Sequence, residues 1–204
     1  MPPFPEDTIT KPFDLRLEIR SANGSSTEFF QSDEQHVRAT LPLLAAPRLF
    51  TQPHLLLASE DCASMIPCKG IDMIMVRTTA PLPLKFPLEL PAGLFDIAEH
   101  SDPRPDKRPA AIEAHDGQPR QRNSLVEIHT LGGWVVTLET VAMFRGNAHD
   151  ERQFFSRLTT MLTIPFRLAE GGFGLINNVN IVRVSAWPKP EMLPGLVLPL
   201  SLRR

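Results

Sequence analysis

The sequence contains one apolar pattern twice, once in each half of the chain. Residues 66–74 have isoleucine at the first, sixth and ninth positions, and residues 176–184 have isoleucine, isoleucine and valine at the same positions. This agreement constrains the fold strongly, because it puts apolar side chains at the same places along two separate segments. We therefore predict that the chain is an internal duplication of one small module.

Two further blocks occur in the same order in both halves. Residues 17–21, Leu-Glu-Ile-Arg-Ser, match residues 126–130, Val-Glu-Ile-His-Thr. Residues 51–56 match residues 163–168, where each block begins Thr-x-Pro. A module of roughly 65 residues buries little apolar surface by itself. We therefore expect the two copies to pack together with pseudo-two-fold symmetry.

The first copy reads as two strands, a helix and three short strands. Polar and apolar residues alternate from residue 13 to residue 20, which predicts a half-buried strand, and Asn23-Gly24 predicts the hairpin turn after it. Ser32 is a good N-cap for a helix that ends near Pro47. Further strands of this copy are expected at residues 27–31, 54–58, 62–67 and 71–77.

The second copy repeats this order from Ser124 onward. Gly132-Gly133 falls where the first hairpin turn fell, and Gly171-Gly172 is predicted as a later turn. Residues 149–162 have a broad apolar face, which predicts a helix. Strands of this copy are expected at residues 126–130, 134–143, 163–168, 173–177 and 181–187.

The sequence thus predicts an α+β fold with two tandem ββαβββ modules. Each module is expected to form a bent antiparallel sheet or a small barrel with one packed helix. Proline marks the segments around the modules, since the chain holds 21 prolines, about twice the usual share. The expected segments are a Pro-rich lead (1–12), the first repeat (13–78), a connector that is flexible in its second half (79–123), the second repeat (124–187) and a Pro/Leu-rich tail (188–204). Residues 93–100 could form one or two helical turns.

Charge and hydropathy argue against several classes of partner. The net charge is −2 and the pI is about 6.3, so the whole chain does not attract nucleic acid or anionic membrane. No apolar run approaches the roughly 18 residues of a spanning helix. The first residues lack the basic and apolar regions of a signal peptide, and Cys62 and Cys68 make no disulfide framework. We expect a cytoplasmic protein without membrane contact.

No set of residues has the pattern of a catalytic, cofactor or metal site. The chain has no Gly-x-Ser-x-Gly motif, no His pair at metal-ligand spacing and no phosphate-binding glycine loop before a helix. We therefore predict neither enzyme activity nor a cofactor nor a metal. The weak binding candidates are amide and guanidinium groups of the second copy, which could contact a polar ligand or a base edge: Asn177, Asn178, Asn180, Arg167 and Arg183.

The function that these features favour is a non-catalytic binding or regulatory protein that acts through protein–protein contacts. Its partner would be another protein or a second copy of this chain. Two alternatives stay open at this point. The second repeat could bind nucleic acid through its asparagines and arginines, or the junction of the two repeats could form an enzyme's cleft.

Overall fold

The structure is a computed structural model that describes residues 14–44, 48–58, 62–82, 94–100, 120–144, 156, 158 and 160–188. The expected lead (1–12), residues 83–93 and 101–119 of the expected connector and nearly all of the tail lie outside the described residues. The described elements are strands β1 (Leu15–Ser21), β2 (Ser26–Gln31), β3 (His54–Ala58), β4 (Ala63–Pro67), β5 (Ile71–Thr78), β6 (Leu94–Glu99), β7 (Arg120–Thr130), β8 (Val135–Phe144), β9 (Thr163–Arg167), β10 (Phe173–Asn177) and β11 (Ile181–Trp187), with helix α1 (Glu34–Leu44) and the 3-10 turns η1 (Leu49–Thr51), η2 (Cys68–Gly70) and η3 (Asn178–Asn180).

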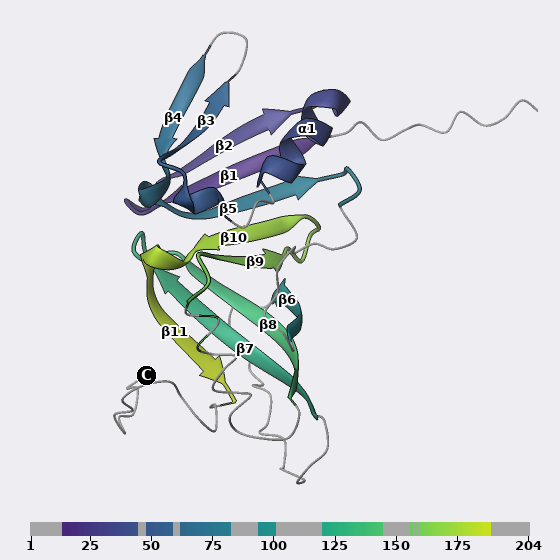
Figure 1. Cartoon of the computed structure of the whole chain (residues 1–204), viewed down its shortest axis with the longest axis vertical. Helices are drawn as coiled ribbons and strands as arrows, with labels where there is room; N and C mark the ends of the chain where they lie inside the picture. Colours follow the sequence, from purple (N-terminus) through teal and green to yellow (C-terminus); the bar gives the residue numbers. More distant parts are fainter. Residues whose placement is uncertain are drawn as a thin grey trace, which may run out of the picture.

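One mixed sheet of nine strands dominates the described part of the chain, in the order β11-β7-β8-β6-β9-β10-β5-β1-β2. A separate hairpin, β3–β4, stands beside its β2 end (Figure 1). The expected α+β fold of two tandem ββαβββ modules with one helix each is therefore wrong: the described chain is mostly β, with one large sheet that includes strands of both halves and with α1 as the α-helix of the first half. Of the helix expected over residues 149–162, only Ser156, Leu158 and Thr160 are described, in helical conformation.

The two halves nevertheless agree strand by strand in their register. Leu17 of β1 lies opposite Val76 of β5, and Val126 of β7 lies opposite Ala186 of β11, so matched residues have matched partners. The outer pairs agree as well, because β1 pairs with β2 as β7 pairs with β8. The β1–β5 and β7–β11 pairs also change register at equivalent places, next to Ser21–Ile71 and Thr130–Ile181.

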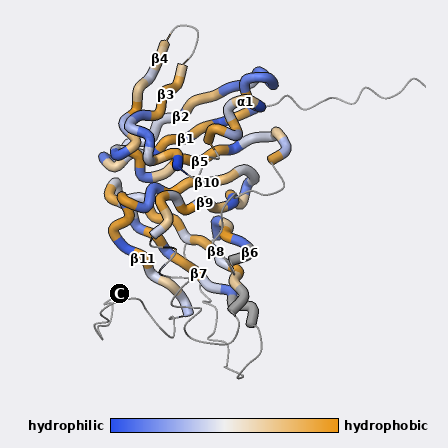
Figure 2. The backbone as a smooth tube through the Cα atoms, viewed as in Figure 1, coloured by the Kyte–Doolittle hydropathy of each residue, from blue (hydrophilic) through white to orange (hydrophobic). Residues whose placement is uncertain are grey.

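A strand of each half joins the two halves into one sheet. β10 of the second half pairs antiparallel with β5 of the first half, with Phe173 opposite Val76. The alternating side chains of β5 then serve two cores. Ile74 and Val76 pack with β1 and α1, whereas Met73 and Met75 pack with β7, β8 and β9. This is why β5 is apolar on both faces from Met73 to Val76. Figure 2 shows the apolar core-forming strands, β5 among them, largely in orange.

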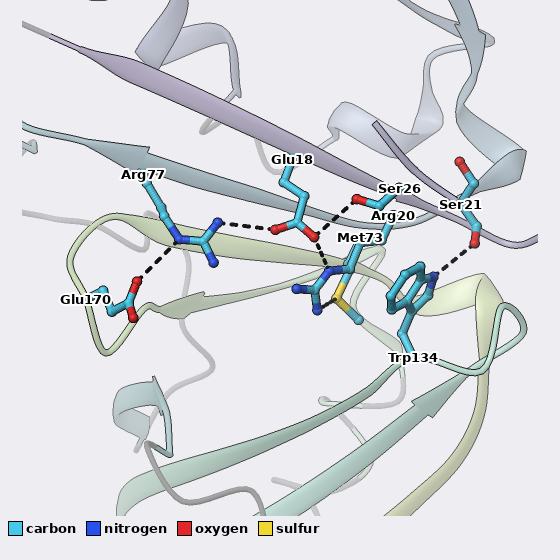
Figure 3. A network of polar contacts seen from close by, with 8 residues as sticks. All are labelled: Glu18, Arg20, Ser21, Ser26, Met73, Arg77, Trp134 and Glu170. Carbon is cyan, nitrogen blue, oxygen red and sulfur yellow. Dashed lines mark hydrogen bonds and ion pairs between the residues drawn. The ribbon is translucent and has the colours of Figure 1, made fainter. Parts of the chain in front are cut away.

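Side-chain contacts also join the two halves beside the β5–β10 pair. We call this junction of the two halves the seam. Asp72 is fully buried, and its Oδ2 accepts a hydrogen bond from the Gly132 N–H at 2.6 Å. The Trp134 indole N–H donates to the Ser21 carbonyl at 3.0 Å, and the Arg20 guanidinium lies 5.1 Å from the Trp134 ring centroid (Figure 3). The turn of the second half is thus fixed against the end of β1, and the halves form one body.

Three local expectations are corrected by the structure. The cap of α1 is Asp33 and not Ser32, because the Asp33 Oδ1 accepts the His36 N–H at 2.9 Å. Residues 94–99 form strand β6 where helical turns were expected, and β7 already begins at Arg120. β6 inserts between β8 and β9, so part of the expected connector belongs to the sheet.

The Thr-x-Pro block is matched in the wrong register. Leu55 pairs with Ile66 in the β3–β4 hairpin, and Ile164 pairs with Ile176 in the β9–β10 hairpin. Because Ile66 and Ile176 correspond in the Ile pattern, Leu55 corresponds to Ile164. The sequence match had aligned Leu55 with Arg167, so this block does not report equivalent positions.

Candidate functional site

Two of the five predicted binding residues hold the seam together. The Asn177 amide donates to the carbonyls of Cys68 and Ile71, at 3.2 and 2.9 Å. The Asn180 amide donates to the carbonyls of Lys69 and Ile71, at 3.1 and 3.0 Å. Both side chains are buried, and their partners belong to η2 and β5 of the other half. The asparagines of the second half therefore satisfy backbone groups of the first.

The other three predicted binding residues also have partners within the chain. The Asn178 amide donates to the Met161 carbonyl. Arg167 forms a bidentate ion pair with Asp96 of β6, and the hydrogen bond raises the Arg167 pKa above its usual value. The structure does not gather the five candidates into one surface: two lie in the seam, one at the start of η3, one on β9 and one on β11.

Arg183 belongs to a polar cluster around Glu127 and His129, and these two residues have counterparts at the same strand positions of the first half, Glu18 and Arg20. In the second half, Glu127 lies between His129 and Arg183, whose side chains also contact each other. Burial would raise the Glu127 pKa, but the hydrogen bond and charge of His129, with the charge of Arg183, hold it below its usual value of 4.5.

The corresponding cluster of the first half is more enclosed. Glu18 accepts hydrogen bonds from Arg20 at 2.6 Å, from Ser26 at 3.2 Å and from Arg77 at 3.2 Å (Figure 3). Burial would raise the Glu18 pKa, but these bonds and the Arg20 charge outweigh it and lower the pKa below 4.5. Arg77 also reaches Glu170 of the second half. Both clusters are satisfied ion-pair networks, and neither leaves a carboxylate directed at an open site.

An apolar groove is the feature of the described residues that best suits ligand binding. It lies in the first half, between β2, α1 and the β3–β4 hairpin, and has a volume of about 400 Å³. Its floor is formed by Leu15 and Leu17 of β1, and its walls by Phe29 of β2 and Leu57 of β3. This volume falls at the lower end of pockets that hold small ligands or a few side chains.

Large apolar side chains stand exposed around this groove. Phe30 is 63% exposed, Leu43 69% and Leu56 70%, and all three line the groove. Each is the neighbour of an inward-facing apolar residue, so both faces of the local strand or helix are apolar. We call Phe30, Leu43 and Leu56 the rim of the groove.

The rim residues were not predicted from the sequence, because the predicted core contained only their neighbours, which lie on the opposite face of each element. The signal was present: Phe29-Phe30 and Leu55-Leu56-Leu57 are unbroken apolar runs in strands. Successive residues of a strand point to opposite sides, so such a run predicts a strand covered on both faces. In this structure one of those faces is open.

The described residues offer no other evident chemistry. They contain no group of three or more His, Cys, Asp or Glu side chains placed to hold a metal ion. Of the helical segments that are described, none has the length and apolar character needed to cross a membrane. Comparison with known proteins finds no matching family model, no significantly similar curated protein and no significantly similar solved structure. The groove is therefore the feature of the described residues that best indicates a function.

Proposed function

We propose that this chain is a non-catalytic binding or regulatory protein that holds an apolar segment of another protein in the groove of its first half. The groove of about 400 Å³ and its exposed rim carry the proposal. Contiguous exposed apolar side chains are uncommon on monomeric proteins, and they mark interaction sites when polar surface surrounds them. Binding would bury Phe30, Leu43 and Leu56, and each fully buried large apolar side chain contributes about 1.5–3 kcal/mol.

The polar groups of the second half support this choice over a polar ligand. The amides of Asn177 and Asn180 and the guanidinium of Arg167 are engaged within the chain, so using them for nucleic acid would first break those contacts. A cytoplasmic location stays a prediction. It is supported by Cys62 and Cys68, which form no disulfide in the described part of the chain.

A peptide-display selection on the full chain tests the proposed function. The wild-type protein is the bait, and each selected peptide is then titrated against Phe30→Glu. The matched control is Val182→Glu, because Val182 is 62% exposed on β11, at the opposite edge of the sheet.

We expect selected peptides to be rich in apolar residues and to bind Phe30→Glu about tenfold more weakly than wild type, as for a residue central to an interface. Val182→Glu should bind like wild type. Peptides that bind all three proteins equally, or a selection that enriches none, would contradict the proposed function.

A further inference from the structure

The second half shows what fills the position that corresponds to the groove. β8 and β9 correspond to β2 and β3 by register. Between β8 and β9 lies β6, which pairs antiparallel with β8 and parallel with β9. The side chain of Ile97 in β6 points inward and is fully buried in the core of the second half. One inserted strand thus closes the sheet on that side.

In the first half, no described strand occupies this place. Among the described strands β2 pairs only with β1, and β3 pairs only with β4. The groove lies between these two edges, since residues of both β2 and β3 line it. An unpaired strand edge offers a row of free backbone donors and acceptors to another strand. We call the space between these edges the strand slot.

We infer that the strand slot accepts one extended strand of a partner protein, antiparallel to β2 and parallel to β3, as β6 lies in the second half. This inference rests on the proposed function and specifies its binding mode. Strand addition supplies affinity through backbone hydrogen bonds, and the alternate side chains of the added strand enter the groove. The partner strand would continue the nine-stranded sheet beyond β2 and join the β3–β4 hairpin to it.

A second copy of the described fold cannot supply this strand. A strand that fills the slot needs both of its edges free, and every described strand already pairs along at least one edge. The occupant that we propose is an extended segment of a partner protein that brings no sheet of its own.

The slot also specifies the outward side chains of its occupant. In the second half, Ala98 of β6 lies between Glu139 and Arg167, and Arg167 binds Asp96 on the same face. By register, Phe30 stands in place of Glu139 and Ala58 in place of Arg167. The cation that holds an acidic residue is missing, and a phenyl ring replaces the carboxylate. The occupant should therefore be apolar on both faces, unlike β6.

Two synthetic peptides probe this inference directly. The first has the sequence of residues 93–100, which contains β6, and the second carries leucine in place of the residue corresponding to Asp96. Both are labelled and titrated into the full chain and into the variants Ala58→Arg and Phe30→Glu. Ala58 is exposed, and Ala58→Arg places a guanidinium where the second half has Arg167.

We expect wild type to bind the leucine peptide better than the native peptide. Ala58→Arg should reverse this preference by about threefold to fivefold, the effect of an exposed ion pair. N-methylation of any central peptide amide should weaken binding about tenfold, because both edges of an inserted strand form hydrogen bonds. Amide exchange along β2 should slow when the peptide binds.

Three results would overturn the inference. Display-selected peptides that depend on Phe30 but tolerate N-methylation would leave the proposed function intact and remove the strand mode. An unchanged preference in Ala58→Arg would refute the equivalence with β6. A dimer in light scattering that Phe30→Glu dissociates would show that a second copy covers the groove. By contrast, the proposed function itself fails only when no selected peptide depends on Phe30.

Discussion

The two halves of this molecule share their registers but differ in where their hairpins go. β9–β10 lies inside the nine-stranded sheet, between β6 and β5, whereas β3–β4 forms a sheet of its own. The shared blocks determine how β1, β2 and β5 pair, and β7, β8 and β11 pair in the same way. The difference lies in the neighbours of the hairpins, since β9–β10 pairs with β6 and β5 whereas β3–β4 pairs with no other described strand.

One residue pair in the hairpins gives the strongest way to break this comparison. Phe166 lies opposite Gly174 in the second half, and Leu57 lies opposite Ser64 in the first. A Cβ atom at residue 174 would lie 2.0 Å from the Phe166 ring, so that ring uses the space that a side chain would need. Gly174→Ser should lower the free energy of unfolding by about 1–3 kcal/mol or more, since buried overpacking costs that much.

Urea denaturation of Gly174→Ser and of the double variant Gly174→Ser with Phe166→Leu measures this effect. The double variant copies the pair of the first half and should recover part of the loss, which a double-mutant cycle reports as coupling. Gly70→Ser is the control, because a Cβ there meets nothing within 4 Å. Strict additivity of the two changes would show that Phe166 does not require the glycine.

The seam asparagines provide the second test, since the first half has no equivalent amides at these positions. Pro67 and Gly70 stand where the second half has Asn177 and Asn180. Asn177→Ala removes one donor from the Cys68 carbonyl, which still accepts from the Ile71 N–H, and one of two side-chain donors from the Ile71 carbonyl. The expected loss is about 0.5–1.5 kcal/mol for each of the two hydrogen bonds, because both carbonyls keep another donor.

The double variant of Asn177 and Asn180 to alanine makes this prediction sharper. Ile71 loses both of its side-chain donors only in the double variant, so the loss should exceed the sum of the single losses by about 0.5 kcal/mol or more. Thermal or urea unfolding gives these values. If both single variants unfold like wild type, the amides do not hold the halves together.

The sequence predicted the strands and the repeated pattern much better than their assembly. The Ile pattern located β5 and β11, and the two Val/Leu-Glu-Ile blocks located β1 and β7, because local alternation and turn glycines determine single strands. It did not predict the pairing of β5 with β10, which depends on contacts between distant residues. The groove was not predicted for a related reason. The exposure of Leu56 depends on whether another strand covers it, and that is again a contact between distant residues.

The glutamate clusters give the smallest expected effect and the finest comparison of the halves. The folded-state pKa of Glu18 and of Glu127 is lowered, so each contributes stability above its unfolded pKa, near 4.5, and loses it as the pH falls through the folded pKa. Glu18→Gln and Glu127→Gln should each lower the free energy of unfolding at neutral pH by at most about 1 kcal/mol. Both should flatten its fall between about pH 5 and pH 3.

The Glu18 side chain should show the larger of these two effects. It is 13% exposed against 26% for Glu127, and three side chains donate to it, so solvent screens its contacts less. Urea unfolding at several pH values, at low and high salt, measures the difference, and high salt should reduce the Glu127 effect first. A larger or less salt-sensitive effect at Glu127 would mean that the enclosed cluster of the first half is no stronger than its exposed counterpart.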